Sequence, residues 1–248
     1  MNATTLDKMK RMRLNGMQRA FKASIESSRI EKLTADEMIA LLIDSEWDDR
    51  HNRSIDRGLK NARFRYKATI EELDFTSERG IDKNTIHRLA DGEFIHRKEN
   101  LLITGSTGTG KSFLASAIGH QACQLGFKVL YTNASRLFAQ LKMAKVDGSS
   151  IKELAKIEKQ DLLILDDFGL QPFDHASRGS LLEVIEDRHG KHSTIITSQL
   201  PVNKWYDVIG EKTVADAILD RLVHNAQRLE LKGESLRRKL NKKATDNN

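Results

Sequence analysis

Residues that interrupt or cross-link a chain are scarce in this sequence. Its 248 residues include only two prolines and one cysteine. So few prolines argue against long disordered linkers, and a single thiol excludes an internal disulfide framework. A lone thiol is consistent with a reducing cytoplasm, and we interpret Cys123 as a small buried residue of a helix.

A long apolar run is also missing. The longest, Met38–Ile43, is far shorter than the roughly 20 residues that cross a membrane. No apolar core follows the first residues, so we expect a cytoplasmic protein that is neither exported nor bound to a membrane. Hydrophobic residues at 39% and charged residues at 31% are typical of a globular protein. The length suffices for one full α/β domain plus a small second one.

Positive charge is what the chain has in excess. The formal net charge is +6 and the isoelectric point is near 9.3. Residues 1–67 carry 15 Lys and Arg against 10 Asp and Glu, and residues 221–243 carry 8 against 2. Basic flanks favour a polyanionic partner, most naturally nucleic acid. The alternative, a charged surface that only keeps the protein soluble, stays open at this point.

One segment fits the phosphate-binding pattern G-x-x-x-x-G-K-[ST] without substitution. Glycines let the backbone turn tightly and aim N–H groups inward at a helix N-terminus, which makes an anion site. Residues 100–104 before the loop are apolar enough for a buried strand, and Leu114 and Ile118 after it have helical spacing. We therefore expect a nucleoside triphosphate, held by Gly105, Ser106, Thr107, Gly108, Thr109, Gly110, Lys111, Ser112 and Phe113.

Two acids at the end of a second apolar strand complete the expected site. Asp166 and Asp167 follow four apolar residues, and Asp166 lies 55 positions after Lys111. Ligands bind at the carboxyl ends of strands in a parallel sheet. Lys111 can reach the β- and γ-phosphates, and Ser112 with Asp166 can hold Mg²⁺. Asp167 can orient or deprotonate an attacking water, which favours hydrolysis over transfer to a metabolite.

The chain divides into four parts by pattern. We expect a small all-helical N-terminal domain over 1–70, a packed connector over 71–99, a nucleotide-binding domain over 100–240 and a disordered tail over 241–248. Apolar spacing predicts one amphipathic helix spanning Leu6 to Phe21. A capping box at Thr34–Glu37 begins a second helix that runs to Phe64, with a break near residues 48–52.

Strands and helices alternate after residue 99. A short helix is expected over 84–90, and a Lys-rich helical stretch over 134–159 is broken at 147–150. Alternation of this kind predicts a parallel sheet covered by helices on both faces. The expected strands are 100–104, 128–132, 162–165, 194–197 and 228–231.

Taken in order, five motifs resemble those of the AAA+ ATPases, a branch of the P-loop NTPases with a parallel five-stranded sheet. Within them the whole chain looks like the IstB-type transposition helpers, close relatives of the DnaC/DnaI helicase loaders. The first motif alone is generic to nucleotide binders, and the ordered set is far more specific. The motifs are 105–112, 162–167, 194–201, 220–222 and 232–238.

The resemblance implies roles for three further residues. Gln199 matches the sensor-1 position that helps to place the attacking water, with Ser198 as the less favoured alternative. Arg221 matches the arginine finger that reaches the γ-phosphate held by a neighbouring subunit. Arg237 matches the sensor-2 arginine, and Arg238 beside it leaves that assignment open by one position.

The resemblance also implies partners. Such proteins form homo-oligomers with ATP and Mg²⁺ at subunit interfaces, bind double-stranded DNA, and work with a transposase. No recognition motif such as a zinc finger is visible, so DNA contact should be mostly sequence-independent and directed at phosphates. Basic residues of the N-terminal region form a DNA-facing stripe or, alternatively, a solvated face. The candidate contacts are Arg53, Arg57, Lys60, Lys142 and Lys145.

Three rival functions stay open from the sequence. A replicative helicase loader shares all five motifs, and its partner would be a helicase. A nucleoside or metabolite kinase explains the phosphate loop but not the paired acids, the basic flanks or Arg221. A DNA-binding scaffold with a degenerate ATPase conflicts with the intact Lys111, Ser112 and Asp167.

Overall fold

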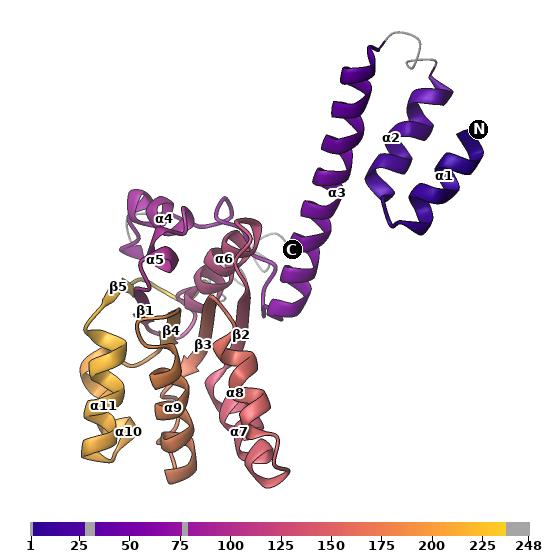
Figure 1. Cartoon of the computed structure of the whole chain (residues 1–248). Helices are drawn as coiled ribbons and strands as arrows, with labels where there is room; N and C mark the ends of the chain where they lie inside the picture. The colour runs from indigo at the N-terminus through magenta and orange to yellow at the C-terminus, as the bar shows by residue number, and fades with distance from the viewer. Residues whose placement is uncertain (1, 28–32, 76–78, 237–248) are drawn as a thin grey trace, which may run out of the picture. The chain divides into compact units, whose positions relative to one another are not determined.

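The structure is a computed structural model that describes residues 2–27, 33–75 and 79–236 (Figure 1). The chain separates into two compact units, residues 1–57 and residues 58–248. Arg237, Arg238 and the expected tail over 241–248 lie outside the described residues. Within the described part of the chain, no helix is long and apolar enough to cross a membrane.

The N-terminal unit is helical, but its first helix is shorter than predicted. The single helix expected from Leu6 to Phe21 is in fact two, α1 (Asn2–Arg11) and α2 (Asn15–Glu26). Arg13 between them has a φ of +59°, a left-handed conformation that ends a right-handed helix. The apolar spacing continues across the break, which is why periodicity alone did not reveal it.

The third helix is longer than predicted. Helix α3 runs without interruption over Ala35–Ala62, so the break expected near residues 48–52 is wrong. Ion pairs of Glu46 with Arg50 and of Asp49 with Arg53, each four positions apart, bridge that stretch. The predicted capping box is confirmed, because the Thr34 N–H donates to Glu37 Oε2 at 2.8 Å and the Glu37 N–H donates back to Thr34 Oγ1.

The second unit contains the predicted parallel five-stranded sheet, which confirms the α/β fold class. Its strand order is β2-β3-β4-β1-β5, and every neighbouring pair is parallel. The order places β1, β3 and β4 side by side in the centre, so that their carboxyl ends meet. The strands are β1 (Asn100–Gly105), β2 (Val129–Asn133), β3 (Leu162–Phe168), β4 (Ser193–Ser198) and β5 (Ala226–Leu231).

Helices join the strands, as the alternation predicted. The short helix expected over 84–90 is confirmed as α4, and the break at 147–150 is confirmed between α7 and α8. At that break the Asp147 carboxylate accepts a hydrogen bond from the Ser149 N–H at 2.9 Å. The remaining bounds are α4 (Lys83–Ala90), α5 (Glu93–His96), α6 (Lys111–Gln124), α7 (Ala134–Val146), α8 (Ser150–Glu158), α9 (His175–Arg188), a 3₁₀ turn (Val202–Lys204), α10 (Trp205–Ile209) and α11 (Lys212–Val223).

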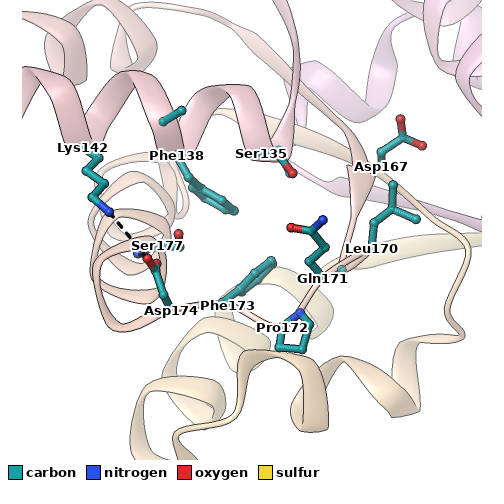
Figure 2. A pocket seen from close by; sticks show the side chains of 13 residues that line it. Ser135, Phe138, Lys142, Asp167, Leu170, Gln171, Pro172, Phe173, Asp174 and Ser177 are labelled. Atoms are coloured by element: carbon teal, nitrogen blue, oxygen red, sulfur yellow. Dashed lines mark hydrogen bonds and ion pairs between the residues drawn. The ribbon is translucent and has the colours of Figure 1, made fainter.

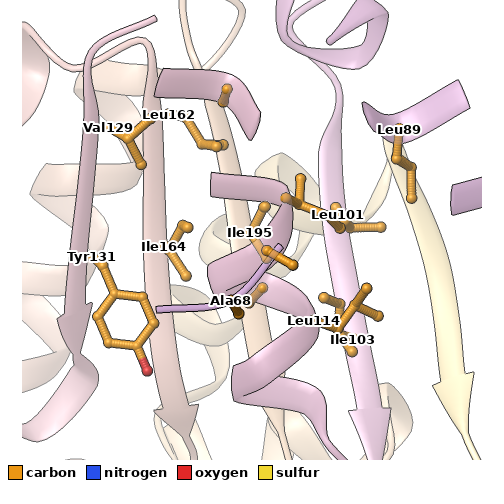
Figure 3. Close-up of a cluster of buried hydrophobic side chains, with 14 of the residues drawn as sticks. Ala68, Leu89, Leu101, Ile103, Leu114, Val129, Tyr131, Leu162, Ile164 and Ile195 are labelled. Carbon is orange, nitrogen blue, oxygen red and sulfur yellow. The ribbon is translucent and has the colours of Figure 1, made fainter. Parts of the chain in front are cut away.

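Two apolar layers cover the sheet, and successive strand residues alternate between them. Leu101, Ile103 and Ile164 pack with α6 on one face, as Figure 3 shows for part of this cluster. Leu102 and Leu163 point to the other face, where α7, α9 and α11 lie. Packing on both faces holds the central strands in place. The loops at the carboxyl ends of these strands are therefore fixed in position.

The single cysteine belongs to the first of these layers. Cys123 on α6 is buried, which confirms the interpretation of this residue as a small core side chain. Burial raises the pKa of its thiol to about 11.

Candidate nucleotide site

The phosphate loop connects β1 to the N-terminus of α6, and glycine is required at two of its positions. Gly105 and Gly108 have φ values of +147° and +85°. A Cβ on Gly105 would lie 2.3 Å from the Leu231 carbonyl oxygen, and one on Gly108 would lie 2.2 Å from Ser235 Oγ. The loop is therefore packed against the segment that follows β5, which the sequence pattern did not indicate.

Lys111 is the cation of this loop and lies almost wholly inside it. Its Nζ donates to the carbonyl oxygens of Gly105 and Ser106, both at 2.8 Å. Burial lowers the pKa of Lys111, and the neighbouring Asp167 and Asp166 oppose that shift. A cation enclosed by backbone at a helix N-terminus is suited to bind the phosphates of a nucleotide.

Asp166 lies at the end of β3 and is fully buried. Its Oδ1 accepts a hydrogen bond from Ser112 Oγ at 2.7 Å and another from Thr197 Oγ1. Its Oδ2 accepts from the Tyr131 hydroxyl and, at 3.4 Å, from Arg65 Nη1. A carboxylate and a hydroxyl in contact are the hard oxygen ligands that Mg²⁺ prefers, so these residues fit that ion.

Asp167 follows at a distortion of the sheet. Its φ is +58°, and the register between β3 and β4 shifts between Leu165 and Phe168. Oδ2 of Asp167 accepts from Asn133 Nδ2 at 3.0 Å and from Arg65 Nη1 at 3.2 Å. Among the described residues, the other carboxylate oxygen makes no hydrogen bond. That oxygen is therefore available to a water molecule.

The end of β4 reaches the same place. Gln199 Oε1 accepts a hydrogen bond of 2.6 Å from Thr107 Oγ1 in the phosphate loop. Ser198 Oγ instead donates to the Phe168 carbonyl oxygen at 2.7 Å and is fully buried. The structure thus brings Gln199 to the loop, whereas Ser198 ties two strands together.

Arg221 is not part of this cluster. It lies on α11, where Nη2 contacts Glu186 Oε1 at 3.0 Å and Nη1 donates to the Ala217 carbonyl oxygen at 2.8 Å. In the described residues it has no contact with the phosphate loop or with the two acids. This position fits a residue that acts on another subunit, but the geometry of one chain leaves that role a prediction.

The basic residues named from the sequence differ in their surroundings. Lys142 points toward Asp174 at 4.0 Å (Figure 2), and Lys145 pairs with Glu183 at 3.3 Å. In the N-terminal unit, Arg53 pairs with Asp49, and Arg57 Nε donates to the Arg53 carbonyl oxygen of its own helix at 3.3 Å. Lys60 lines a large groove in the second unit.

Sequence reasoning missed several residues of the site. Thr197 lies within a motif that had been singled out, and Asn133 directly follows a predicted strand. The meeting of strand ends could therefore have indicated both. Arg65 belongs to the basic stripe of the N-terminal region, but no pattern placed it beside the two acids. Nor did any pattern indicate the buried Arg79, whose Nη1 donates to the Thr109 carbonyl oxygen at 3.1 Å. Arg65 lies just after α3 and Arg79 belongs to the connector, so local spacing places neither beside the phosphate loop or the two acids.

A glycine-rich loop after β1, an acid at the end of β3 and this strand order define a P-loop NTPase of the AAA+ type. Solved structures with this fold include DnaI, with a TM-score of 0.57 and 21% identity over 68% of this chain and 90% of that one. AMPPCP-bound DnaA from Aquifex aeolicus has a TM-score of 0.60 and 18% identity over 75% of this chain and 57% of that one. Likeness at this level of identity establishes the fold.

The family is established by sequence. The family described as IstB-like ATP binding protein matches residues 7–244, and this chain belongs to it. An insertion sequence ATP-binding protein of Sinorhizobium fredii, y4pL, is 47% identical over 97% of this chain and 98% of its own length. The ATP-binding protein of insertion sequence IS21 from Pseudomonas aeruginosa is 33% identical over 95% and 89%. The membership predicted from the five motifs is confirmed.

Proposed function

We propose that this protein hydrolyses ATP, binds DNA, assembles on it, and assists a transposase in target selection and insertion. The observation that carries the proposal is the 2.7 Å hydrogen bond from Ser112 Oγ to Asp166 Oδ1. It joins the phosphate loop and the acidic strand end in one site. A scaffold that only bound DNA would have no need of this arrangement.

The chemistry follows from the side chains around that bond. Ser112 and Asp166 would hold Mg²⁺, which supplies charge neutralisation at the β- and γ-phosphates when it is bound. Lys111 binds the same phosphates, and Asp167 orients a water molecule and accepts its proton. Gln199, held against Thr107, helps to place that water. Catalysis of this kind is mainly positioning plus electrostatic stabilisation.

Support for DNA and a transposase comes from charge and from the relatives. The chain carries a net charge of +6, and the similar proteins are named for insertion sequences, which are mobile DNA. We infer contact mainly with the phosphates of double-stranded DNA, without strong sequence preference. Residues 1–70 would provide contact with DNA or a partner, 71–99 the connector, and 100–240 the ATPase domain.

Assembly would place Arg221 at the ATP of a neighbouring subunit. Its side chain is 29% exposed and its partner Glu186 is 50% exposed, so the pair can separate without unfolding α11. A γ-phosphate would then replace Glu186 as the partner of the guanidinium. Arg237, or Arg238 beside it, would act as the sensor-2 arginine from the segment after β5.

The test of this proposal mixes two inactive variants. Arg221→Ala should bind ATP nearly normally and hydrolyse it about 10³-fold more slowly, because the finger supplies transition-state charge. Lys111→Ala should lose ATP binding with an unchanged circular dichroism spectrum. A mixed interface combines the pocket of the first variant with the finger of the second, so activity should recover as protein concentration rises. No recovery in mixtures that demonstrably assemble would contradict a role of Arg221 in the neighbouring subunit.

Two further measurements separate the rival functions. Phosphate release without any metabolite acceptor is expected here and would not occur with a metabolite kinase. A helicase loader of the DnaC/DnaI type is the second candidate, supported by the shared fold. Pull-down against a transposase and a replicative helicase distinguishes the two, because the proposal predicts retention of the transposase alone.

A further inference from the structure

A large groove runs along the outer edge of the sheet in the second unit. Its volume is about 1260 Å³, and all five residues of β2 line it. Within the described residues β2 pairs only with β3, so its other edge presents backbone N–H and C=O groups to the groove. Asp166 and Asp167 of the nucleotide site also line the groove.

Cations dominate the rest of the lining. Apart from Asp166 and Asp167, the groove contains one acid, Glu153, which is already engaged by Lys156 and by Gln140 Nε2. The six cationic side chains that line it are Lys60, Arg63, Arg65, Lys128, Arg136 and Lys156.

Four of these cations lack a counter-ion. In the part of the chain that the structure describes, Lys60, Arg63, Lys128 and Arg136 form no ion pair, and all four are exposed. Lys145, which lies on the same helix as Arg136, is by contrast paired with Glu183. Unpaired cations beside open backbone N–H groups are what a phosphodiester backbone requires.

Arg65 connects the groove to the ATP site. Its side chain is 45% exposed to the groove, while Nη1 contacts Asp167 Oδ2 at 3.2 Å and Asp166 Oδ2 at 3.4 Å. The guanidinium also lies 5.5 Å from the centre of the Tyr66 ring, and Tyr66 packs on Phe113 at the start of α6. Both contacts use Nη1, so Nε and Nη2 can still donate to a phosphate, which would compete with the two carboxylates for the charge of this guanidinium.

We propose that this groove binds a phosphodiester backbone of DNA, and that Arg65 couples its occupancy to the nucleotide site. The inference rests on the proposed function, since it gives DNA binding a location and a consequence. A phosphate in the groove attracts Arg65 away from Asp166, which then becomes a better ligand for the Mg²⁺ of a bound nucleotide. DNA and Mg²⁺-nucleotide therefore strengthen each other's binding, and by linkage each does so by the same factor.

The location is tested with matched neutral variants of two exposed cations. Arg136→Gln and Lys152→Gln each remove one positive charge, but only Arg136 lines the groove. Affinity for a short duplex and for a single strand of equal length is measured by fluorescence anisotropy over a range of salt. Arg136→Gln should flatten the slope of log affinity against log salt by about 0.9 per lost contact, and Lys152→Gln should not. Whichever DNA form shows the larger change is the form that the groove holds.

The coupling is tested by binding alone. The affinity for a non-hydrolysable ATP analogue with Mg²⁺ is measured with and without DNA, and the affinity for DNA with and without the analogue. In the wild type both should rise by the same factor, on the order of tenfold. Arg65→Gln should bind each ligand separately and reduce both factors to about one, and Arg65→Lys should restore part of them. Full coupling in Arg65→Gln would overturn the role of Arg65.

The outcomes separate this inference from the proposed function. Wild-type protein that binds no DNA would contradict both. If Arg136→Gln and Lys128→Gln both bind DNA as tightly as the wild type does, the proposed function stands and the groove is excluded as the DNA site. In that case an acidic protein segment, or a second copy of the chain detected by sizing, is the remaining occupant.

Discussion

The N-terminal unit and the α/β unit each bury one carboxylic acid, and the surroundings of the two differ. Among the described residues, Glu46 and Asp166 are the only buried acids. Glu46 accepts hydrogen bonds from the backbone N–H groups of Gly16 and Met17, at 2.8 and 3.2 Å, and from Arg50 Nε at 2.7 Å. It therefore caps the N-terminus of α2 while lying on α3.

Within the described ranges, no backbone N–H donates to the carboxylate of Asp166. Its four partners are the side chains of Ser112, Thr197, Tyr131 and Arg65. A backbone N–H of a helix cannot leave its acceptor without local unfolding, whereas a hydroxyl or guanidinium can rotate away. Glu46 therefore has a structural role and keeps its partners as long as α2 is folded. Asp166 can exchange its partners for a metal ion, and the comparison teaches that burial alone does not identify a functional acid.

The comparison is tested most strongly by neutralising Asp166. Asp166→Asn keeps the shape of the side chain and removes the charge that would bind Mg²⁺, so ATP hydrolysis should fall by roughly 10²–10³-fold. Thermal unfolding should stay near the wild-type midpoint, because a buried charge is expensive to keep. A large loss of stability with normal turnover would reverse the distinction drawn here between the two acids.

The next largest effect is expected in the α/β unit alone and concerns the rate at which Cys123 is alkylated. Because burial raises the pKa of Cys123 to about 11, its thiolate is scarce near pH 8. Alkylation of the folded protein should be at least about 100-fold slower than that of the unfolded chain, whose thiol has a pKa of roughly 8.5. Mass spectrometry after timed exposure to iodoacetamide measures the rate. Equal rates would show that α6 opens readily.

Glu46→Gln should affect the other unit. The substitution leaves backbone donors at α2 and the Arg50 guanidinium without a charged partner, at a cost of about 2 kcal/mol in the free energy of unfolding. Hydrogen exchange in α2 should accelerate while the alkylation rate of Cys123 and the affinity for ATP stay unchanged. Glu153→Gln, which alters an ion pair within α8 of the other unit, is the control. Faster Cys123 labelling in Glu46→Gln would show that the two units unfold together.

The smallest expected effect is the pH dependence of the stability that Glu46 gives to the N-terminal unit. Burial alone would raise the pKa of Glu46, but hydrogen bonds from Arg50, Met17 and Gly16 outweigh it and hold the pKa below its ordinary value. A lowered folded-state pKa stabilises the unit above the unfolded pKa of about 4.3, and this contribution disappears as the pH falls through the folded value. Urea unfolding at neutral and acidic pH should show it in the wild type and not in Glu46→Gln.

Much of the second unit could be predicted because its signals are local. The runs of apolar residues at Leu101–Ile103 and Leu162–Leu165 define central strands wherever they occur. Ser112 and Asp166 were expected to share a metal ion from their motifs alone, and they lie in contact. In the N-terminal unit the same reasoning placed one helix where there are two. The second of these helices begins where the N–H groups of Gly16 and Met17 donate to Glu46 of α3, some thirty positions away.

Gly16 shows why that contact has no local signature. A Cβ at this position would lie 2.1 Å from the Ser45 carbonyl oxygen, so α2 and α3 approach more closely than any other residue permits. In the sequence, a lone glycine within an amphipathic pattern gives no indication of its partner. The approach also brings the N-terminus of α2 onto Glu46, and the start of that helix is thereby fixed.

Local sequence patterns suffice to predict the phosphate loop, the strand that carries the two acids, and the class of the fold. Each depends on neighbouring residues, through glycine conformations and the alternation of buried side chains. Packing of the folded chain is what sets the donors around Asp166, pairs Arg65 with both acids, and places unpaired cations along the edge of β2. Those features join residues from separate segments, and their energies arise only when packing has brought the segments together.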